Sequence, residues 1–199
     1  MKIADSSGLD AVTMRGLAVE LGVRPMSLYH HIATKEELLD ALIDVVHTEV
    51  YVPRTGADWR EELARRSRSL WDALGRHPWA LPVMETRVDP GAANLAGHEA
   101  VLDVLRTSGF SLEATANAYA VLDAFVYGAA LQRIMLATAG LEDTAGQVAQ
   151  AMNLSRHPRI AELAGHYVNA AEYPFTRTFD VGLELVLDGI ARLRDADPA

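Results

Sequence analysis

Cysteine is absent from the 199-residue sequence, which excludes disulfide bonds and thiolate metal sites. Long hydrophobic runs are also absent: no unbroken apolar stretch of about 18 residues and no signal-peptide pattern occurs. These two absences argue against a membrane span and against secretion. A chain without disulfide bonds fits a reducing cytosol, so we expect a cytoplasmic protein with no membrane partner.

Motifs typical of enzymes are missing as well. The sequence has no Gly-x-Ser-x-Gly elbow, phosphate-binding loop, dinucleotide-binding glycine pattern or His-Glu-x-x-His pair. His157 and His166 are nine residues apart, a spacing that does not place both on one helical face. We therefore predict a protein that is not an enzyme and that holds no cofactor and no metal.

Charge is distributed unevenly along the chain. The formal net charge of −9 argues against nucleic acid as a partner. Between positions 13 and 35, however, the basic residues Arg15, Arg24 and Lys35 stand against Glu20 alone. The segment from 13 to 35 therefore has the local charge that a DNA-binding surface requires, although residues 1–50 as a whole are negatively charged.

Apolar residues recur at helical spacing and strand-like alternation is nearly absent, which predicts an all-α fold. In the N-terminal part, Thr13 is a plausible N-cap of a short helix and Gly22 is its left-handed C-cap. Pro25 suits the first turn of the next helix. The residues TKEE at 34–37 form a capping box that opens a longer helix.

The remaining chain predicts a second, larger helical domain. We place the boundary near Val50, so that residues 1–50 form one domain with its linking helix and residues 51–199 form the other. Six further helices are expected: one capped by Asp58, then 92–107, 111–139, a short helix around 151, 161–170 and 174–193.

A helix, a glycine-containing turn of about three residues and a second helix make the helix-turn-helix arrangement. Leu17, Ala18 and Leu21 can pack against Val23, Leu28 and Ile32, which leaves a face of hydroxyl and imidazole groups outside. Such groups reach phosphates and base edges, and Met26 can contact a thymine methyl group. Spacing alone also allows an ordinary helical hairpin whose Tyr and His side chains lie on the surface.

The segment TMRGLAVELGVRPMSLYHHIATKEELLDAL, at 13–42, resembles the DNA-binding signature of the TetR family of bacterial repressors. The matching positions are Leu17, Ala18, Gly22, Val23, Leu28, Tyr29, His31, Lys35, Leu38 and Leu39. The rest of the chain is similar to the tetracycline-repressor subgroup of that family, notably in HPW at 77–79 and SGFSLEATANAYAVLDAFVYGAALQ at 108–132.

This resemblance implies the DNA-contacting residues. The positions that match phosphate-holding residues of the family are Thr13, Arg15, Ser27, Tyr29 and Lys35. Those that match positions near base edges are Arg15, Pro25, Met26 and His30, and His31 matches the histidine at the end of the recognition helix. The family's first helix normally begins well before the equivalent of Gly8, so we expect the first helix of this chain to be truncated.

Family members of this kind bind a small molecule among the C-terminal helices. An apolar and aromatic lining is available here, and Tyr51 matches a ligand-contacting position in the family. The predicted lining residues are Tyr51, Trp71, Trp79, Met84, Leu102, Tyr119, Phe125 and Tyr127, with Arg87, His98, Asp123 and Gln132 as orienting polar groups. A plain hydrophobic core is the alternative for any one of them.

Two departures from the tetracycline-repressor pattern affect the ligand. That subgroup uses an imidazole and a carboxylate around a magnesium–drug chelate. Alignment places Gln132 at the carboxylate position and Val83 or Met84 at the histidine position. Because amide and apolar groups are poor partners for magnesium, we expect a largely apolar organic effector that needs no metal.

Apolar stripes in two long helices predict a dimer interface. The predicted interface residues are Val126, Ala130 and Ile134 in one helix and Phe179, Leu183, Val186 and Ile190 in the last helix. Pairing these stripes across a two-fold axis gives a four-helix interface, although packing within one chain is the alternative. A homodimer reads two half-sites, so the expected partner is double-stranded, palindromic operator DNA.

Together these patterns predict a ligand-responsive transcriptional repressor that releases its operator when the effector binds. The rival interpretation is a helical ligand-binding or scaffolding protein that does not bind DNA, which the acidic net charge and the short first helix favour.

Overall fold

The protein is described here by a computed structural model, which defines residues 1–84, 86, 91–138, 154–168 and 174–196. Helices make up all of its regular elements and these residues contain no strand, which confirms the all-α prediction. The elements in chain order are α1 (Lys2–Ser7), the short 3-10 turn η1 (Leu9–Ala11), α2 (Met14–Leu21), α3 (Pro25–Tyr29), α4 (Lys35–Thr48), α5 (Trp59–Arg76), α6 (Ala80–Met84), α7 (Ala92–Thr107), α8 (Leu112–Thr138), α10 (Pro158–Val168) and α11 (Pro174–Ala196).

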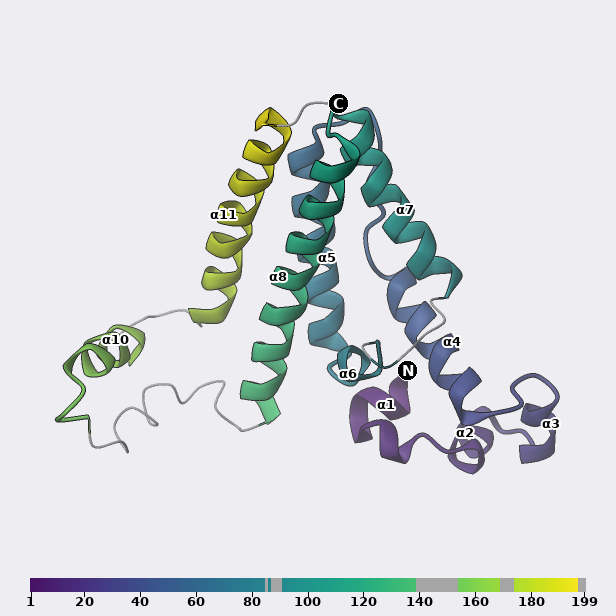
Figure 1. Ribbon diagram of the computed structural model, residues 1–199. Helices are drawn as coiled ribbons and strands as arrows, with labels where there is room; N and C mark the ends of the chain where they lie inside the picture. The colour runs from purple at the N-terminus through teal and green to yellow at the C-terminus, as the bar shows by residue number, and fades with distance from the viewer. Residues whose placement is uncertain (85, 87–90, 139–153, 169–173, 197–199) are drawn as a thin grey trace.

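Two groups of helices are visible in Figure 1. The first, which we call the head, consists of α1, η1, α2 and α3 at one end of the molecule. The second, which we call the body, is built from α5 to α8 and α11, and α4 runs from the head into it. Figure 1 shows α10 apart from the other helices.

Local chemistry explains the boundaries of α2 in the head. The Thr13 hydroxyl accepts a hydrogen bond from the Gly16 N–H at 3.0 Å, as an N-cap does. Gly22 has φ of +66°, and the Val23 N–H donates to the Ala18 carbonyl at 2.9 Å, which ends the helix in a Schellman motif. Both predicted caps are confirmed.

Packing inside the head is looser than the sequence predicts. Ala18 and Leu28 are buried between α2 and α3, as expected. Leu21 and Val23, which we predicted to join them, are instead 57% and 43% exposed. Because α2 and α3 are so short, only one side of each reaches the small core, and residues at its margin stay in contact with solvent.

The capping box at the start of α4 is also confirmed. The Thr34 hydroxyl accepts from the Glu37 N–H at 3.1 Å, and the Glu37 carboxylate accepts from the Ala33 N–H at 2.8 Å. Farther along, Ile43 and Val46 are buried where α4 packs against α7 and α6. The helix therefore begins in the head and ends inside the body.

The helix α5 lies at the centre of the body and contacts α4, α7, α8 and α11. Asp58 caps it by accepting from the Glu61 N–H at 3.0 Å, as predicted. Trp71 stacks on Phe179 of α11 with ring centroids 4.7 Å apart. Outside this core, Arg60 and Arg68 form ion pairs with acidic residues of α11, so the two helices are joined by both apolar and charged contacts.

The residues predicted to form a dimer interface lie mostly inside one protomer. The side chains of Val126, Ala130, Phe179, Leu183 and Ile190 are all at most 4% exposed, and Ile134 and Val186 pack against the same core. The intramolecular alternative is therefore correct for these positions. The error has a simple cause: α8 is apolar on more than one side, so its pattern does not identify which side faces inward.

The outward side of α8 carries a second apolar stripe. Val121, Leu131 and Met135 are 49%, 45% and 63% exposed, and Ala124 and Gly128 continue the same row at spacings of three and four. On α11, Val181 and Leu185 are 55% and 67% exposed. By length and composition α8 is the one helix in the described part of the chain that could also cross a membrane, which is weak evidence for a span.

The predicted helix boundaries agree closely with the described ones. The 92–107 prediction matches α7, and 111–139 differs from α8 by one residue at each end. Instead of starting at 161, α10 starts at Pro158, a residue suited to the first helical turn. The helix predicted around 151 lies outside the described residues.

Candidate functional site

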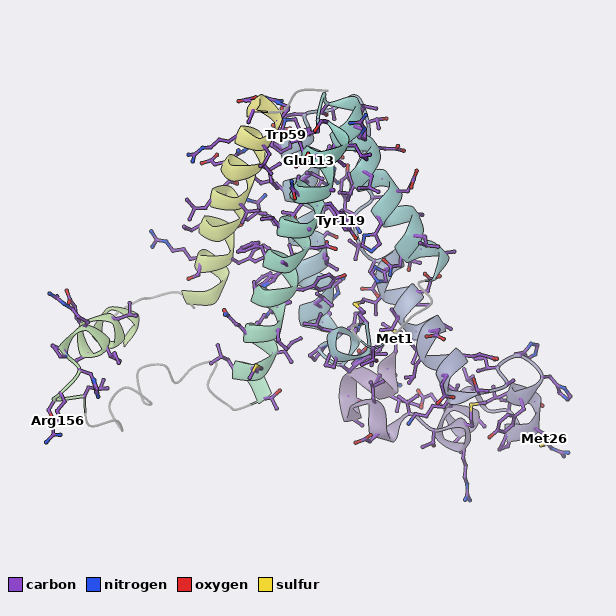
Figure 2. The ribbon with its side chains drawn as sticks, in the orientation of Figure 1. Met1, Met26, Trp59, Glu113, Tyr119 and Arg156 are labelled. Atoms are coloured by element: carbon purple, nitrogen blue, oxygen red, sulfur yellow. The ribbon has the colours of Figure 1, made fainter. Side chains whose placement is uncertain are left out.

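All of the predicted DNA-contacting side chains lie on the surface of the head and the start of α4. These residues are Thr13, Arg15, Pro25, Met26, Ser27, Tyr29, His30, His31 and Lys35. Figure 2 shows Met26 at the extremity of the molecule, on the end remote from the body. Within α3 only Leu28 turns inward, so the rest of this short helix is free to enter a groove.

The electrostatics of this surface are more basic than the net charge suggests. Glu20 is paired with Lys2 at 3.0 Å. Arg15, Arg24 and Lys35 make no ion pair with any residue in the described ranges. The Thr13 hydroxyl accepts its helix-capping bond but keeps its own proton for an external acceptor. The head therefore presents several unused donors to a phosphate backbone.

A cluster of polar side chains lies inside the body, where α4, α5, α7 and α8 meet. The Tyr119 hydroxyl is 2.7 Å from His98 Nδ1, and the rings of His98 and His47 are 6.5 Å apart. Arg66 and Asp123 lie close enough to this group to influence its charges. Figure 2 places Tyr119 within the body, far from the head. We call these five residues the polar cluster.

Burial controls the ionisation of the polar cluster. Burial, with help from His98 and Arg66, lowers the pKa of His47 to about 4. Burial lowers the pKa of His98 and of Arg66 too, although Asp123 opposes both shifts. Burial and the nearby carboxylate of Asp123 raise the pKa of Tyr119 to about 12. At neutral pH the cluster therefore offers neutral imidazoles and a neutral phenol beside one cation and one carboxylate.

Arg66 is the buried cation of the cluster. Arg66 is only 7% exposed, and its Nη1 donates to the Tyr51 carbonyl oxygen at 3.1 Å. A Cβ on Gly97 would come within 2.9 Å of Nη2, so glycine leaves the room that the guanidinium occupies. Asp123 lies close enough to favour the charged guanidinium, and so opposes the lowering of the Arg66 pKa by burial.

A very small cavity adjoins Arg66. It measures about 10 Å³, roughly the space for one water molecule. Its lining combines polar groups with apolar side chains: Arg66, Ser67, Leu70, Val101, Tyr119, Leu122, Asp123 and Val126. This cavity by itself therefore has no room for an organic molecule.

A larger cavity of about 280 Å³ opens between α5, α8 and α11. It is mainly aromatic and apolar, lined by Trp71, Ala124, Phe125, Gly128, Ala129, Gln132, Thr178 and Phe179. Three predicted ligand-binding residues, Trp71, Phe125 and Gln132, come together here, while Tyr119, Asp123 and His98 belong to the polar cluster. The predicted ligand site is thus divided between two places.

Two predicted ligand-binding residues are engaged elsewhere. The Tyr51 hydroxyl donates to Glu62 at 2.8 Å, and its ring lies under the Arg65 guanidinium at 3.9 Å. The Trp79 indole donates to Asp5 of α1 at 2.7 Å. Neither lines a cavity described above: Tyr51 closes the α4–α5 loop and Trp79 joins the head to the body, and their binding of a ligand stays a prediction.

The other predicted ligand-binding residues in the described ranges line neither of these two cavities. Met84 and Tyr127 pack against the hydrophobic core, and Leu102 is half-buried on α7. Arg87 lies outside the described residues. In the ranges that are described, no group of three or more His, Asp or Glu side chains is arranged to hold a metal ion.

Sequence reasoning missed Arg66 and His47. Both interrupt an apolar stripe: Arg66 follows Trp59 and Leu63 on the buried side of α5, and His47 follows Ile43 on that of α4. A charged or titratable residue at a core-facing helical position was the available signal, because such residues are rarely buried without a function or a partner.

Comparison with known families identifies the fold. Residues 1–42 match the family of bacterial regulatory proteins called tetR, and residues 52–194 match the tetracyclin repressor-like C-terminal domain. The chain belongs to the TetR family. It is therefore a DNA-binding transcriptional regulator, and the helix-turn-helix interpretation is confirmed over that of an ordinary hairpin.

Similarity to individual TetR-family proteins extends along nearly the whole chain. It is 33% identical to the HTH-type transcriptional repressor DrrR1 of Streptomyces coeruleorubidus, over 96% of this chain and 73% of that protein. It is 29% identical to the class A tetracycline repressor from transposon 1721 of Escherichia coli, over 98% and 88% of the two chains.

Solved structures of TetR-family proteins are also similar to nearly the whole chain. The TetR-family protein ActR of Streptomyces coelicolor, crystallised with actinorhodin, has a TM-score of 0.75 and 31% identity over 96% of this chain and 92% of its own. A possible TetR-family regulator from Streptomyces coelicolor A3(2) reaches a TM-score of 0.80 at 28% identity, over 97% and 95% of the two chains.

The depressed pKa of His47 predicts a loss of stability in acid. The ordinary value is 6.5 and the folded value about 4, so between these pH values the unfolded chain binds a proton that the folded chain does not. The free energy of unfolding should fall by about 2 kcal/mol from pH 7 to pH 5 through this group. Chemical denaturation at both pH values measures the difference.

His47→Leu should remove that part of the pH dependence, whereas His157→Phe, which alters an exposed histidine, should leave it intact. An equal pH dependence in the wild type and in His47→Leu would show that His47 is not the responsible group.

Proposed function

We propose that this protein is a homodimeric repressor that reads a palindromic operator with α3 and releases it when a small molecule binds in the body. The exposed face of α3, flanked by the exposed basic side chains of Arg15, Arg24 and Lys35, is the observation that carries the DNA-binding part. Tyr29, Ser27 and Lys35 hold phosphates, and Pro25, Met26 and His30 face base edges. Reading a bacterial operator places the protein in the cytoplasm.

Replacing Lys35 tests the DNA-binding surface. We expect Lys35→Ala to weaken operator binding and to lower the slope of log affinity against log salt by roughly one for each protomer, because one phosphate contact is lost. Fluorescence anisotropy with labelled DNA from the region upstream of the gene, titrated at several salt concentrations, gives both quantities.

Arg192→Ala is the matched control, since it removes an exposed cation from α11, outside the head. Its salt slope should equal that of the wild type. A wild-type protein that binds this DNA no better than unrelated DNA would favour the rival interpretation, a helical ligand-binding protein without an operator.

For the effector site we propose the polar cluster and the apolar side chains around it. Leu70, Val101 and Leu122 supply an apolar surface, and Arg66, Tyr119 and Asp123 recognise hydroxyl, carbonyl or acidic groups. A largely apolar molecule with a few oxygen atoms, such as an aromatic polyketide, fits this combination. ActR, which is similar in structure, was crystallised with actinorhodin.

We infer how the effector causes release of the operator from the small size of the cavity beside Arg66. Because about 10 Å³ holds no organic molecule, an effector binds only a conformation in which the surrounding helices have moved apart. His47 of α4 belongs to the polar cluster, so this movement displaces the helix that carries the head. The spacing of the two recognition helices then no longer fits successive major grooves.

A thermal-shift screen of aromatic polyketides, actinorhodin included, should find a molecule that lowers operator affinity. Coupling of about 1–3 kcal/mol corresponds to a 5- to 150-fold loss. Operator DNA must weaken binding of that molecule by the same factor, which calorimetry with and without DNA measures. Tyr119→Phe should reduce its affinity, because the cluster loses a hydroxyl group. Equal affinities in the two titrations would mean that the molecule is not an inducer.

For the dimer we propose the outward stripes of α8 and α11, in place of the interface first predicted. Val121, Leu131, Met135, Val181 and Leu185 form exposed apolar rows on adjacent helices. Pairing these rows with those of a second copy buries them in a four-helix interface. The cavity beside Gln132 opens between the same two helices.

Two neighbouring leucines distinguish interface from core. Leu185→Asp should give a monomer with an unchanged helical spectrum, because an exposed carboxylate harms only the dimer. Leu183→Asp should unfold the protein, because Leu183 is fully buried inside the protomer. Light scattering and circular dichroism record the two outcomes. A dimeric Leu185→Asp variant would exclude this face of α11 from the interface.

A further inference from the structure

Three elements meet at one polar contact between the head and the body. Asp5 of α1 lies with its Oδ1 2.7 Å from His77 Nδ1 and accepts from the Trp79 indole N–H at 2.7 Å. On the other side of the imidazole, His77 Nε2 is 3.2 Å from Glu49, the C-cap of α4. Arg76 completes the group by donating to the same Glu49 oxygen at 2.8 Å.

The body side of this contact, made by His77 and Trp79, is sheltered from water. The His77 side chain is 8% exposed, and its ring meets that of Trp79 edge to face with centroids 6.1 Å apart. Although burial opposes it, hydrogen bonds from His77 and Trp79 lower the pKa of Asp5. The carboxylate is thus held in its charged form by two donors that come from the body, while Asp5 itself belongs to the head.

The helix α4 is fixed to the body independently of Asp5. Asp44 in its middle accepts from the Ala93 and Asn94 N–H groups at 2.8 and 3.3 Å, so it caps the first turn of α7. A Cβ on Gly91 would come within 2.2 Å of the Asp44 carboxylate, which explains the glycine at this close approach. Glu49, at the end of α4, is bound to Arg76 and His77.

The anchoring of α4 and the Asp5 contact constrain different movements. Anchoring α4 fixes the position of that helix, and the head is joined to it through the 30–34 segment and through apolar packing around Leu38. Because apolar packing is not directional, the head remains able to rotate about the end of α4. A second contact at α1, away from that segment, removes this rotation. Asp5 makes hydrogen bonds and an ion pair of this kind across the two parts, and its two partners, His77 and Trp79, both belong to the α5–α6 connection.

We propose that Asp5, His77 and Trp79 form a latch that sets the orientation of the head on the body, and that they are positioning residues for operator binding although none of them touches DNA. The part that concerns DNA rests on the proposed function. The part that concerns the orientation of the head on the body does not depend on that function. A change in the α5–α6 connection reaches the head through this latch without passing along α4.

The absence of cysteine makes a direct distance measurement possible. Val19→Cys in the head and Glu113→Cys in the body lie at exposed positions on α2 and α8, and neither is a proposed DNA contact. Spin labels on both, in full-length protein diluted with unlabelled protein, give the head-to-body distance distribution within one protomer by pulsed electron resonance. This readout needs neither DNA nor an effector.

We expect Asp5→Asn to broaden or shift this distribution and to weaken operator binding by about fivefold or more. Trp79→Phe keeps an aromatic ring but removes the indole N–H donor, so its effect should be smaller than that of Asp5→Asn. Asp5→Glu keeps the carboxylate and should preserve part of the wild-type behaviour. Glu20→Gln is the matched control, because it breaks an acid–base pair that lies wholly within the head. That control should leave the distances unchanged.

The outcomes separate the two proposals. A distribution that is the same in the wild type, Asp5→Asn and Trp79→Phe, with all three folded by circular dichroism, would overturn the latch. A changed distribution with unchanged operator affinity would overturn the positioning role. If the wild type binds no operator, the proposed function fails, and the distances still decide whether the latch sets the orientation of the head.

Discussion

One constraint links the parts of this protein: α4 must belong to two cores at the same time. Its first turn is capped by Thr34 next to the recognition helix, and its later turns bury Ile43 and Val46 against α7 and α6. A rigid helix that is packed at both ends transmits any shift of one end to the other. The caps made by Asp44 and Glu49 strengthen the body end, so a shift in the body becomes a movement of the head.

The interior of the body is prepared for recognition at some expense in stability. Burying the Arg66 guanidinium is unfavourable even with the charge of Asp123 nearby, and so is leaving His47 Nε2 without a hydrogen-bond partner among the described residues. The neutral ring of His47 limits this penalty at neutral pH. In the proposed effector site, a ligand with oxygen atoms would form hydrogen bonds with these groups, so the same side chains that cost stability would favour ligand binding.

The helix α8 has two apolar sides, one buried in the protomer and one exposed. Its inner side, with Val126 and Ala130, completes the protomer against α5 and α11, and its outer side, with Val121 and Leu131, remains exposed. An apolar helix with two such sides suits the middle of a larger assembly. Membership of the TetR family and the exposed row on α11 both support a second copy of the chain as the other half of that assembly.

Local signals in the sequence determined the elements: Thr13, Gly22 and the 34–37 capping box predicted helix ends correctly, and the signature around α3 identified a DNA-binding head. Side-chain spacing could not determine which apolar side of α8 faces inward, because both sides have the same period. Nor could it place Tyr51 and Trp79, whose hydroxyl and indole groups bind Glu62 and Asp5 across long sequence separations. Hydrogen bonds within a helical turn depend on neighbouring residues, whereas burial and contacts between helices depend on the whole fold, and only the tertiary structure decided them.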